Sequence, residues 1–204
     1  MLKAKHRRDL DGVHIRVGML FSKFGISANA WTVLSIAPAL VGLLFLAKGM
    51  LLPGLAAFFV SAFIDIIDGN VARVTKSVSS LGAFMDGVVD RYVEFLLYVG
   101  LWFYMGPVTD FLISNGLWIV FLVFSAVMPS FITAYADHRG VISDSEKLKN
   151  MGGVLERFER LGIIYLGMAV AYIYPQALVY SIITVIILSN VTAIQRLIYV
   201  VKNS

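Results

Sequence analysis

The sequence predicts an all-α integral membrane protein with six transmembrane helices, an N-terminal amphipathic interfacial helix and both termini in the cytoplasm. Three observations support this fold class. The 204 residues are 59% hydrophobic and only 15% charged, whereas a soluble domain carries about 25% charged residues. Apolar runs recur along the chain, and basic residues gather on one side of the spans that these runs would form. We expect a single membrane domain over 1–204, with an N-terminal segment (1–27) and a six-helix bundle (28–204).

Six stretches are long enough to be transmembrane helices, each of which needs ~20 apolar residues. The predicted spans are Asn29–Ala47, Leu51–Thr75, Leu81–Tyr104, Leu117–Tyr135, Val154–Tyr174 and Gln176–Val201. The fifth has a short apolar run, so its helix is expected to begin upstream, within VLERFER. That start places Arg157 and Arg160 at the membrane boundary, where either could simply extend its charge to the surface.

The segment before the first span, LDGVHIRVGMLFSKFG, has the pattern of an amphipathic helix. Val13, Val17, Leu20, Phe21 and Phe24 fall at helical spacing. We predict a helix that lies on the membrane surface. The alternative is a helix packed against the protein's own core.

The distribution of charge predicts the orientation. Of the 17 Lys and Arg residues, only Lys48 would lie opposite the N-terminus. By the positive-inside rule, the side that holds the other basic residues and both termini is cytoplasmic. We therefore expect a multi-pass protein of the cytoplasmic (inner) membrane, in contact with the lipid bilayer and with no nucleic-acid partner.

The predicted second span carries acidic residues on one helical face. Asp65, Asp68, Gly69, Ala72 and Arg73 fall at i, i+3, i+4, i+7 and i+8 near its cytoplasmic end. The small residues among them would keep this face open for a ligand or a neighbouring backbone.

The predicted third span repeats the arrangement, with Gly82, Asp86 and Asp90 at i, i+4 and i+8. A short connection makes the two helices antiparallel neighbours, so their acidic faces can meet. Four carboxylates would then surround one cavity that is open to the cytoplasm.

Four carboxylates within a membrane require compensation. Each charged Asp near the bilayer centre costs ~2.5–3.5 kcal/mol on insertion scales, and crowded carboxylates repel one another. Hard divalent cations with oxygen ligands, Mg²⁺ in particular, would neutralise them. Two such ions ~3.5–4 Å apart can also neutralise a pyrophosphate. Together with Arg73, suited to phosphate, the pattern indicates phosphoryl chemistry.

Two other interpretations of these charges are open. They could form a structural ion-pair network that includes Arg73 and Arg91, although buried pairs often lose more to desolvation than they gain. They could also belong to an ion-coupled transporter, because acids within membranes mark ion pathways. Such transporters usually have internal repeats and sites at the midplane, and the sequence shows no repeat.

The acidic motif is similar to the signature of the CDP-alcohol phosphotransferases. It reads D-x2-D-G-x2-A-R-x8-G-x3-D-x3-D, without a gap or a substitution, at Asp65, Asp68, Gly69, Ala72, Arg73, Gly82, Asp86 and Asp90. The resemblance implies a transferase that passes the lipid phosphate of a CDP-linked lipid to an acceptor hydroxyl and releases CMP. Phospholipid biosynthesis and a homodimer are further implications.

The resemblance also implies roles for these residues. Asp65, Asp68 and Asp86 would be ligands of Mg²⁺ or Mn²⁺, as two ions. Asp90 would be the general base and would also touch the second metal. A carboxylate beside metal could take the proton of an incoming hydroxyl, which agrees with this role.

The CDP site is implied by the same resemblance. Its expected residues are Asp68, Gly69, Ala72, Arg73, Gly82, Asn29 and Thr32. The last two come from GISANAWT, which resembles the family's G-hydrophobic-T-P-N-x-x-T entry to the first span. Here Ser27 and Ala28 replace the usual threonine and proline.

The acceptor is indicated by two stretches near the C-terminus. LERFERLG and TAIQRL resemble the branch of the family that uses inositol phosphate. This implies that Arg157 and Arg196 bind the acceptor's phosphate and that Arg139 adds to a basic pocket, and the bidentate fork of arginine suits phosphate. Arg196 could instead pair with an acid. Asp137 stands where that branch tends to have a basic residue, so glycerol phosphate or a non-phosphorylated alcohol stays open as the acceptor.

Overall fold

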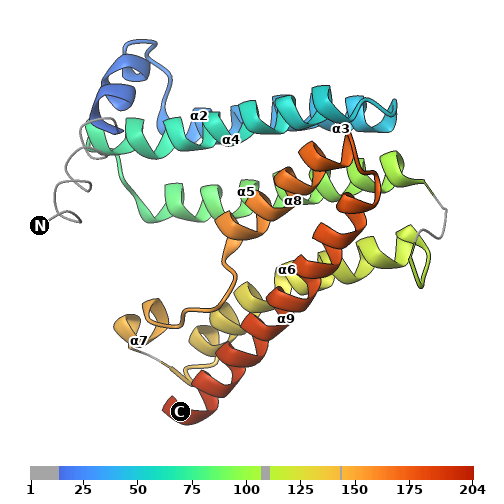
Figure 1. Ribbon diagram of the computed structural model, residues 1–204. Helices are drawn as coiled ribbons and strands as arrows, with labels where there is room; N and C mark the ends of the chain where they lie inside the picture. The colour runs from blue at the N-terminus through green and yellow to red at the C-terminus, as the bar shows by residue number, and fades with distance from the viewer. Residues whose placement is uncertain (1–13, 107–110, 143) are drawn as a thin grey trace, which may run out of the picture. The chain divides into compact units, whose positions relative to one another are not determined.

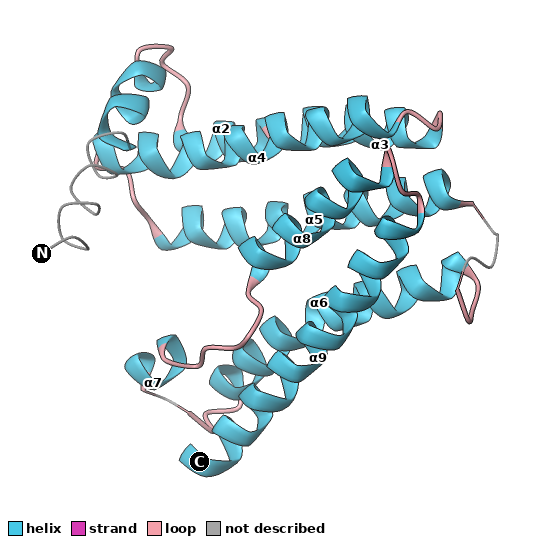
Figure 2. Cartoon of the chain, viewed as in Figure 1, coloured by secondary structure: helices cyan, strands magenta, loops and turns pink. Residues whose placement is uncertain are grey.

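The computed structural model describes residues 14–106, 111–142 and 144–204, which are predominantly helical (Figures 1 and 2). The helices are α2 (Ala28–Leu34), α3 (Ile36–Ala47), α4 (Leu51–Val74), α5 (Ser80–Met105), α6 (Asn115–His138), α7 (Ser145–Lys149), α8 (Arg157–Ala171) and α9 (Gln176–Asn203). A further helix covers residues 14–22. The only extended pairing in the described ranges is an isolated bridge between Phe111 and Ile113. The all-α prediction is therefore confirmed.

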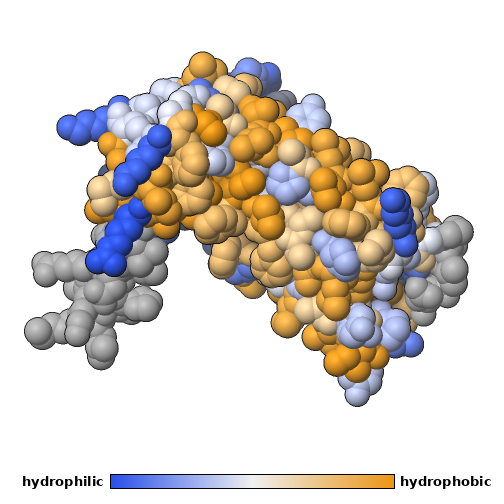
Figure 3. Space-filling model, turned by 90° about the horizontal axis from the view of Figure 1, so that it is seen from above, coloured by the Kyte–Doolittle hydropathy of each residue, from blue (hydrophilic) through white to orange (hydrophobic). Residues whose placement is uncertain are grey.

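Among the residues that the structure describes, four helical segments are long and apolar enough to cross a membrane: Ala28–Ala47, Leu51–Val74, Asn115–His138 and Gln176–Asn203. Helix α5 has 26 residues but contains Asp86, Asp90, Arg91 and Glu94, and α8 has only 15 residues. Apolar side chains cover much of the face drawn in Figure 3. The chain is a multi-pass membrane protein, whereas six spans and cytoplasmic termini remain predictions.

The chain divides into two compact units, Met1–Gly100 and Leu101–Ser204. In the first unit, α3 and α4 pack closely along their lengths. Glycines permit this approach: a Cβ at Gly42 would lie 2.7 Å from the Phe58 ring, and one at Gly54 would lie 2.7 Å from the Leu46 side chain. The single membrane domain expected over 1–204 remains a prediction.

The first predicted span is interrupted at Ser35, where α2 ends and α3 begins. Pro38 explains the break, because its ring clashes with the carbonyl of the residue four positions earlier and it lacks an N–H. The Ser61 hydroxyl of α4 donates to the Ser35 carbonyl oxygen over 2.7 Å. This bond fixes the interrupted helix against α4 and thereby positions α2 for the site.

The helix over 14–22 has apolar side chains both packed against the protein and exposed. Val17 and Phe21 pack against the buried cluster of Trp31, Ile67 and Val71. This contact agrees with the alternative interpretation, in which the helix packs against the protein's own core. Leu20 is instead 56% exposed. Contact with the membrane surface through that side remains a prediction, and Val13 lies outside the described residues.

In the second unit, α9 packs against both α6 and α8. A Cβ at Gly167 of α8 would collide with the Ser181 side chain of α9, so these two helices are in close contact. Helix α8 begins at Arg157, within VLERFER as predicted, but later than the predicted boundary at Val154. Residues 151–156 form an irregular segment before it.

Candidate active site

The acidic residues of the first unit come from two helices joined by a short turn. Asp65 and Asp68 lie in α4, and Asp86 lies in α5. The turn is tight: the Ser77 N–H donates to the Ala72 carbonyl over 2.9 Å, and Lys76 has a φ of 55°. This connection brings the two predicted acidic faces together.

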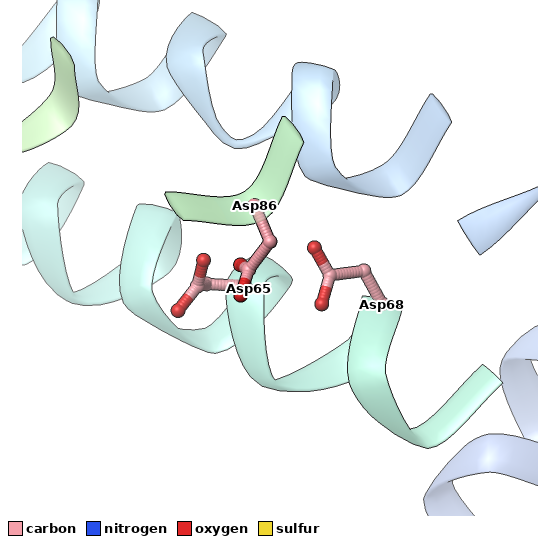
Figure 4. A group of neighbouring side chains, drawn as sticks. All are labelled: Asp65, Asp68 and Asp86. Atoms are coloured by element: carbon pink, nitrogen blue, oxygen red, sulfur yellow. The ribbon is translucent and has the colours of Figure 1, made fainter. Parts of the chain in front are cut away.

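Asp65, Asp68 and Asp86 turn their carboxylates towards one another (Figure 4). One carboxylate oxygen from each lies within 4.8 Å of the other two. Asp68 is 6% exposed, and its Oδ2 atom is buried without a hydrogen-bond partner among the described residues. Because a buried carboxylate oxygen without a donor is costly, Asp68 Oδ2 is an acceptor that suits a cation.

The three acids fit a hard divalent cation. Their ligand atoms are all carboxylate oxygens, the ligands that Mg²⁺ and Mn²⁺ prefer, and they converge from two helices. Asp90 lies one turn further along α5, outside this group of three. Its predicted contact with a second metal therefore remains a prediction.

A cavity of about 280 Å³ lies beside the acids. Its walls are Ala28, Asn29, Thr32, Asp68, Gly69, Ala72, Arg73, Ser77, Val78, Ser79, Gly82, Ala83 and Asp86. All seven residues predicted for the CDP site line it, so residues from α2, α4 and α5 form one concave surface. Their contact with a nucleotide remains a prediction.

The glycines shape this cavity in different ways. A Cβ at Gly69 would meet no atom within 4 Å, so this position borders open space. A Cβ at Gly82 would lie 3.1 Å from Asn29 Oδ1 and 3.2 Å from Ser79 Oγ. Gly82 thus allows α5 to approach α2, whereas Gly69 leaves room in the cavity itself.

Sequence reasoning missed the contribution of the connection between α4 and α5. Ser77 and Ser79 line the cavity, and Ser79 Oγ also accepts from the Gly82 N–H over 3.0 Å. The available signal was a pair of hydroxyl side chains between two acid-bearing helices.

The three arginines predicted for the acceptor all belong to the second unit. Arg196 donates from Nη1 to the Pro129 carbonyl over 2.9 Å and to Thr133 Oγ1 over 3.1 Å. Arg157 is the first residue of α8. Arg139 follows α6, and its guanidinium lies 5.9 Å from the centre of the Tyr135 ring. The structure holds Arg196 against α6, and the binding of an acceptor by these arginines remains a prediction.

Arg160 differs from one sequence-based expectation. The sequence allows Arg160 to extend its charge to the membrane surface, but the residue is only 3% exposed. It lies in α8, and its side chain is buried. Helical periodicity could have indicated this, because Arg160 is four residues before the fully buried Ile164.

Comparison with known proteins agrees with the motif. Residues 25–198 match the family model of the CDP-alcohol phosphatidyltransferases. The archaetidylinositol phosphate synthase of Methanothermobacter thermautotrophicus is 34% identical over 155 residues, which are 76% of this chain and 72% of that protein. The phosphatidylinositol phosphate synthase of Mycobacterium marinum is 30% identical over 182 residues, which are 86% and 74% of the two chains.

Solved structures show the same fold. The phosphatidylinositol phosphate synthase of Mycobacterium tuberculosis with CDP-DAG bound has a TM-score of 0.78 and 23% identity, covering 92% of this chain and 93% of that one. A structure of that protein with manganese and citrate has a TM-score of 0.76 and 24% identity, covering 92% and 88%.

Proposed function

Because the chain belongs to the CDP-alcohol phosphatidyltransferase family, we propose that it transfers the lipid phosphate of a CDP-linked lipid to a hydroxyl of inositol phosphate. The membership makes the protein a transferase of substituted phosphate groups and decides against an ion-coupled transporter. The observation that carries the proposal is the cavity in which Asp68 and Asp86 lie beside Gly69, Arg73 and Gly82.

The reaction exchanges one P–O bond for another. The acceptor hydroxyl oxygen forms a bond to the lipid-bearing phosphorus, and the bond from that phosphorus to the bridging pyrophosphate oxygen breaks. CMP leaves with the bonding electrons. Asp90 takes the proton of the attacking hydroxyl, which raises the nucleophilicity of the oxygen.

The acidic group would hold divalent metal, Mg²⁺ or Mn²⁺, as two ions. Asp65, Asp68 and Asp86 would supply ligands, and Asp90 would add a contact to the second ion. When bound, the metal neutralises the pyrophosphate and stabilises the charge that develops on the attacking and leaving oxygens. The convergence of three carboxylate oxygens within 4.8 Å supports this role.

The remaining cavity residues would bind the CDP moiety. Arg73 lies in the wall and is steadied by a hydrogen bond of 3.4 Å from its Nη1 to Asn70 Oδ1. Its charge suits a phosphate oxygen. Asn29 and Thr32 supply polar groups, while Gly69, Ala72 and Gly82 let the nucleotide lie close to the helix backbones.

Inositol phosphate is the acceptor that the relatives favour, since proteins named archaetidylinositol phosphate synthase and phosphatidylinositol phosphate synthase are similar over most of the chain. Arg139, Arg157 and Arg196 would bind its phosphate. We further propose a homodimer, with the acidic site facing the cytoplasm of the inner membrane.

The test is CMP release from a CDP-linked lipid by purified protein with Mg²⁺. Inositol phosphate, glycerol phosphate, free inositol, serine and no acceptor would be compared. Release with inositol phosphate alone, abolished by EDTA, is expected. Release with glycerol phosphate or free inositol alone would retain the transferase and replace the acceptor.

A further inference from the structure

Two side chains of α9 hold the irregular segment that leads into α8. The Leu155 N–H donates to Thr192 Oγ1 over 3.0 Å, and the Val154 N–H donates to Gln195 Oε1 over 3.1 Å. Thr192 is fully buried and Leu155 is 3% exposed. Two consecutive backbone donors are therefore bound by side chains that lie one helical turn apart on α9.

The Thr192 hydroxyl both accepts and donates a hydrogen bond. Besides accepting from Leu155, its oxygen lies 3.3 Å from the Leu155 carbonyl and 3.0 Å from the Leu188 carbonyl, to either of which it can donate. Shape reinforces this contact, because a Cβ at Gly153 would collide with Thr192 Cγ2. The segment can lie this close to α9 only with glycine at that position.

The same segment is connected to the arginines. Arg157 is the first residue of α8, two residues after Leu155. The capping box between Glu156 and Glu159, whose Oε2 accepts from the Glu156 N–H over 3.0 Å, fixes where α8 starts. Thr192 and the capping box together leave the backbone before Arg157 little freedom.

Arg196 is connected to the same segment indirectly, through Thr133 of α6. Thr133 Oγ1 accepts from Arg196 and lies 3.3 Å from the Met151 sulfur atom, to which its hydroxyl can donate. Arg196 directly follows Gln195 on α9. The contacts of Met151, Val154 and Leu155 thus link the start of α8 to the part of α9 that carries Arg196.

We infer that Thr192 and Gln195 are positioning residues for acceptor binding, because they fix the segment 151–155 and with it Arg157 relative to Arg196. The inference rests on the proposed function of these arginines. Thr192 is fully buried and its hydroxyl contacts Leu155 backbone groups, while Gln195 Oε1 accepts from the Val154 N–H, so we assign their effect on a phosphate to the backbone that they hold.

The test compares Thr192→Val with Thr192→Ser. Valine keeps the shape but leaves the Leu155 N–H without its acceptor, whereas serine keeps the hydroxyl. We expect faster hydrogen–deuterium exchange at the Leu155 amide in Thr192→Val and a KM for inositol phosphate raised about tenfold. The KM for the CDP-lipid should change less than twofold, and Thr192→Ser should resemble the wild type in all three measurements.

A second pair of variants changes the segment instead of Thr192. This pair tests the same contact if Thr192→Val does not fold. Gly153→Ala must displace the segment, whereas Gly152→Ala adds a methyl group that meets no atom within 4 Å. We expect the same selective rise in acceptor KM for Gly153→Ala and wild-type behaviour for Gly152→Ala. The double variant Gly153→Ala/Thr192→Ser lacks the colliding methyl group. A partial return of its acceptor KM to the wild-type value would support the contact.

Different results would overturn the positioning role and the proposed function. If the wild type releases CMP, two results would overturn the positioning role. They are unchanged exchange at the Leu155 amide in Thr192→Val, and equal rises of KM for both substrates. A wild type that released no CMP with any acceptor would refute the proposed function. In that case, unchanged exchange at Leu155 in Thr192→Val would still refute the contact itself.

Discussion

Asn29 Oδ1 in α2 lies 3.1 Å from the point at which a Cβ would extend from Gly82 in α5. The two residues belong to different helices and line the same cavity as Asp68 and Asp86. Their proximity shows that the cavity wall depends on a close approach of α5 to α2. A side chain at position 82 would displace a polar group of the proposed CDP site.

Gly82→Ala is therefore expected to weaken binding of the CDP-lipid about tenfold, because Asn29 and Ser79 must both give way. Gly87→Ala is the matched control, since it lies in the same helix and its Cβ would meet nothing within 4 Å. Titration calorimetry of both detergent-purified variants would measure the affinities. Equal affinities for the two variants would contradict a nucleotide site at this wall.

Asp68→Asn is expected to remove stabilisation by divalent metal. In the wild type, Mg²⁺ or Mn²⁺ should raise the thermal unfolding temperature, because binding to the native state alone stabilises it. Without metal, the variant should be at least as stable as the wild type, since neutral Asn relieves repulsion among Asp65, Asp68 and Asp86. Thermal unfolding with EDTA and with added Mg²⁺ would check both effects. A wild-type unfolding temperature that did not respond to either ion would argue against the metal site.

The geometry of the acidic site could be predicted largely because it depends on local periodicity. Residues three and four positions apart share a helix face, so the spacing from Asp65 to Arg73 and from Gly82 to Asp86 gives two faces. A short turn then leaves few ways for the helices to pair. The structure places Asp65, Asp68 and Asp86 together, which are three of the four carboxylates that the spacing predicted in one group, and Asp90 lies outside this group.

Features that depend on contacts between distant residues could not be predicted in this way. The start of α8 is three residues later than predicted: the capping box of Glu156 and Glu159 fixes it, and Thr192 and Gln195 of α9 bind the Leu155 and Val154 amides of the segment before it. Hydropathy reports where a helix can lie in a membrane, but not which backbone donors a distant side chain will accept. The break at Ser35 could have been predicted from the sequence, because Pro38 is a local signal of a helix break. The length of the apolar run instead favoured one continuous span.

Asp90→Asn should abolish turnover, lowering it about a thousandfold or more, while it leaves CDP-lipid binding and the metal binding by Asp65, Asp68 and Asp86 largely intact. An amide cannot take the proton of the attacking hydroxyl, and general-base catalysis contributes ~10²–10⁴-fold. CMP release measures turnover, and calorimetry with the CDP-lipid measures binding in the same preparation. Full activity in a folded variant would remove Asp90 from the mechanism.

Arg196→Ala should raise the KM for a phosphorylated acceptor much more than the KM for the CDP-lipid, by about tenfold or more, because a charged contact to phosphate is lost. The variant also loses the hydrogen bonds to the Pro129 carbonyl and Thr133 Oγ1, so part of any effect could arise from α6. Thr133→Val tests the contribution of α6, since it keeps the guanidinium but removes the hydroxyl that Arg196 contacts, together with the contact of that hydroxyl to the Met151 sulfur atom. Steady-state kinetics with each substrate varied in turn would measure both variants. Equal rises of the two KM values in Arg196→Ala would assign Arg196 a structural role in joining α9 to α6.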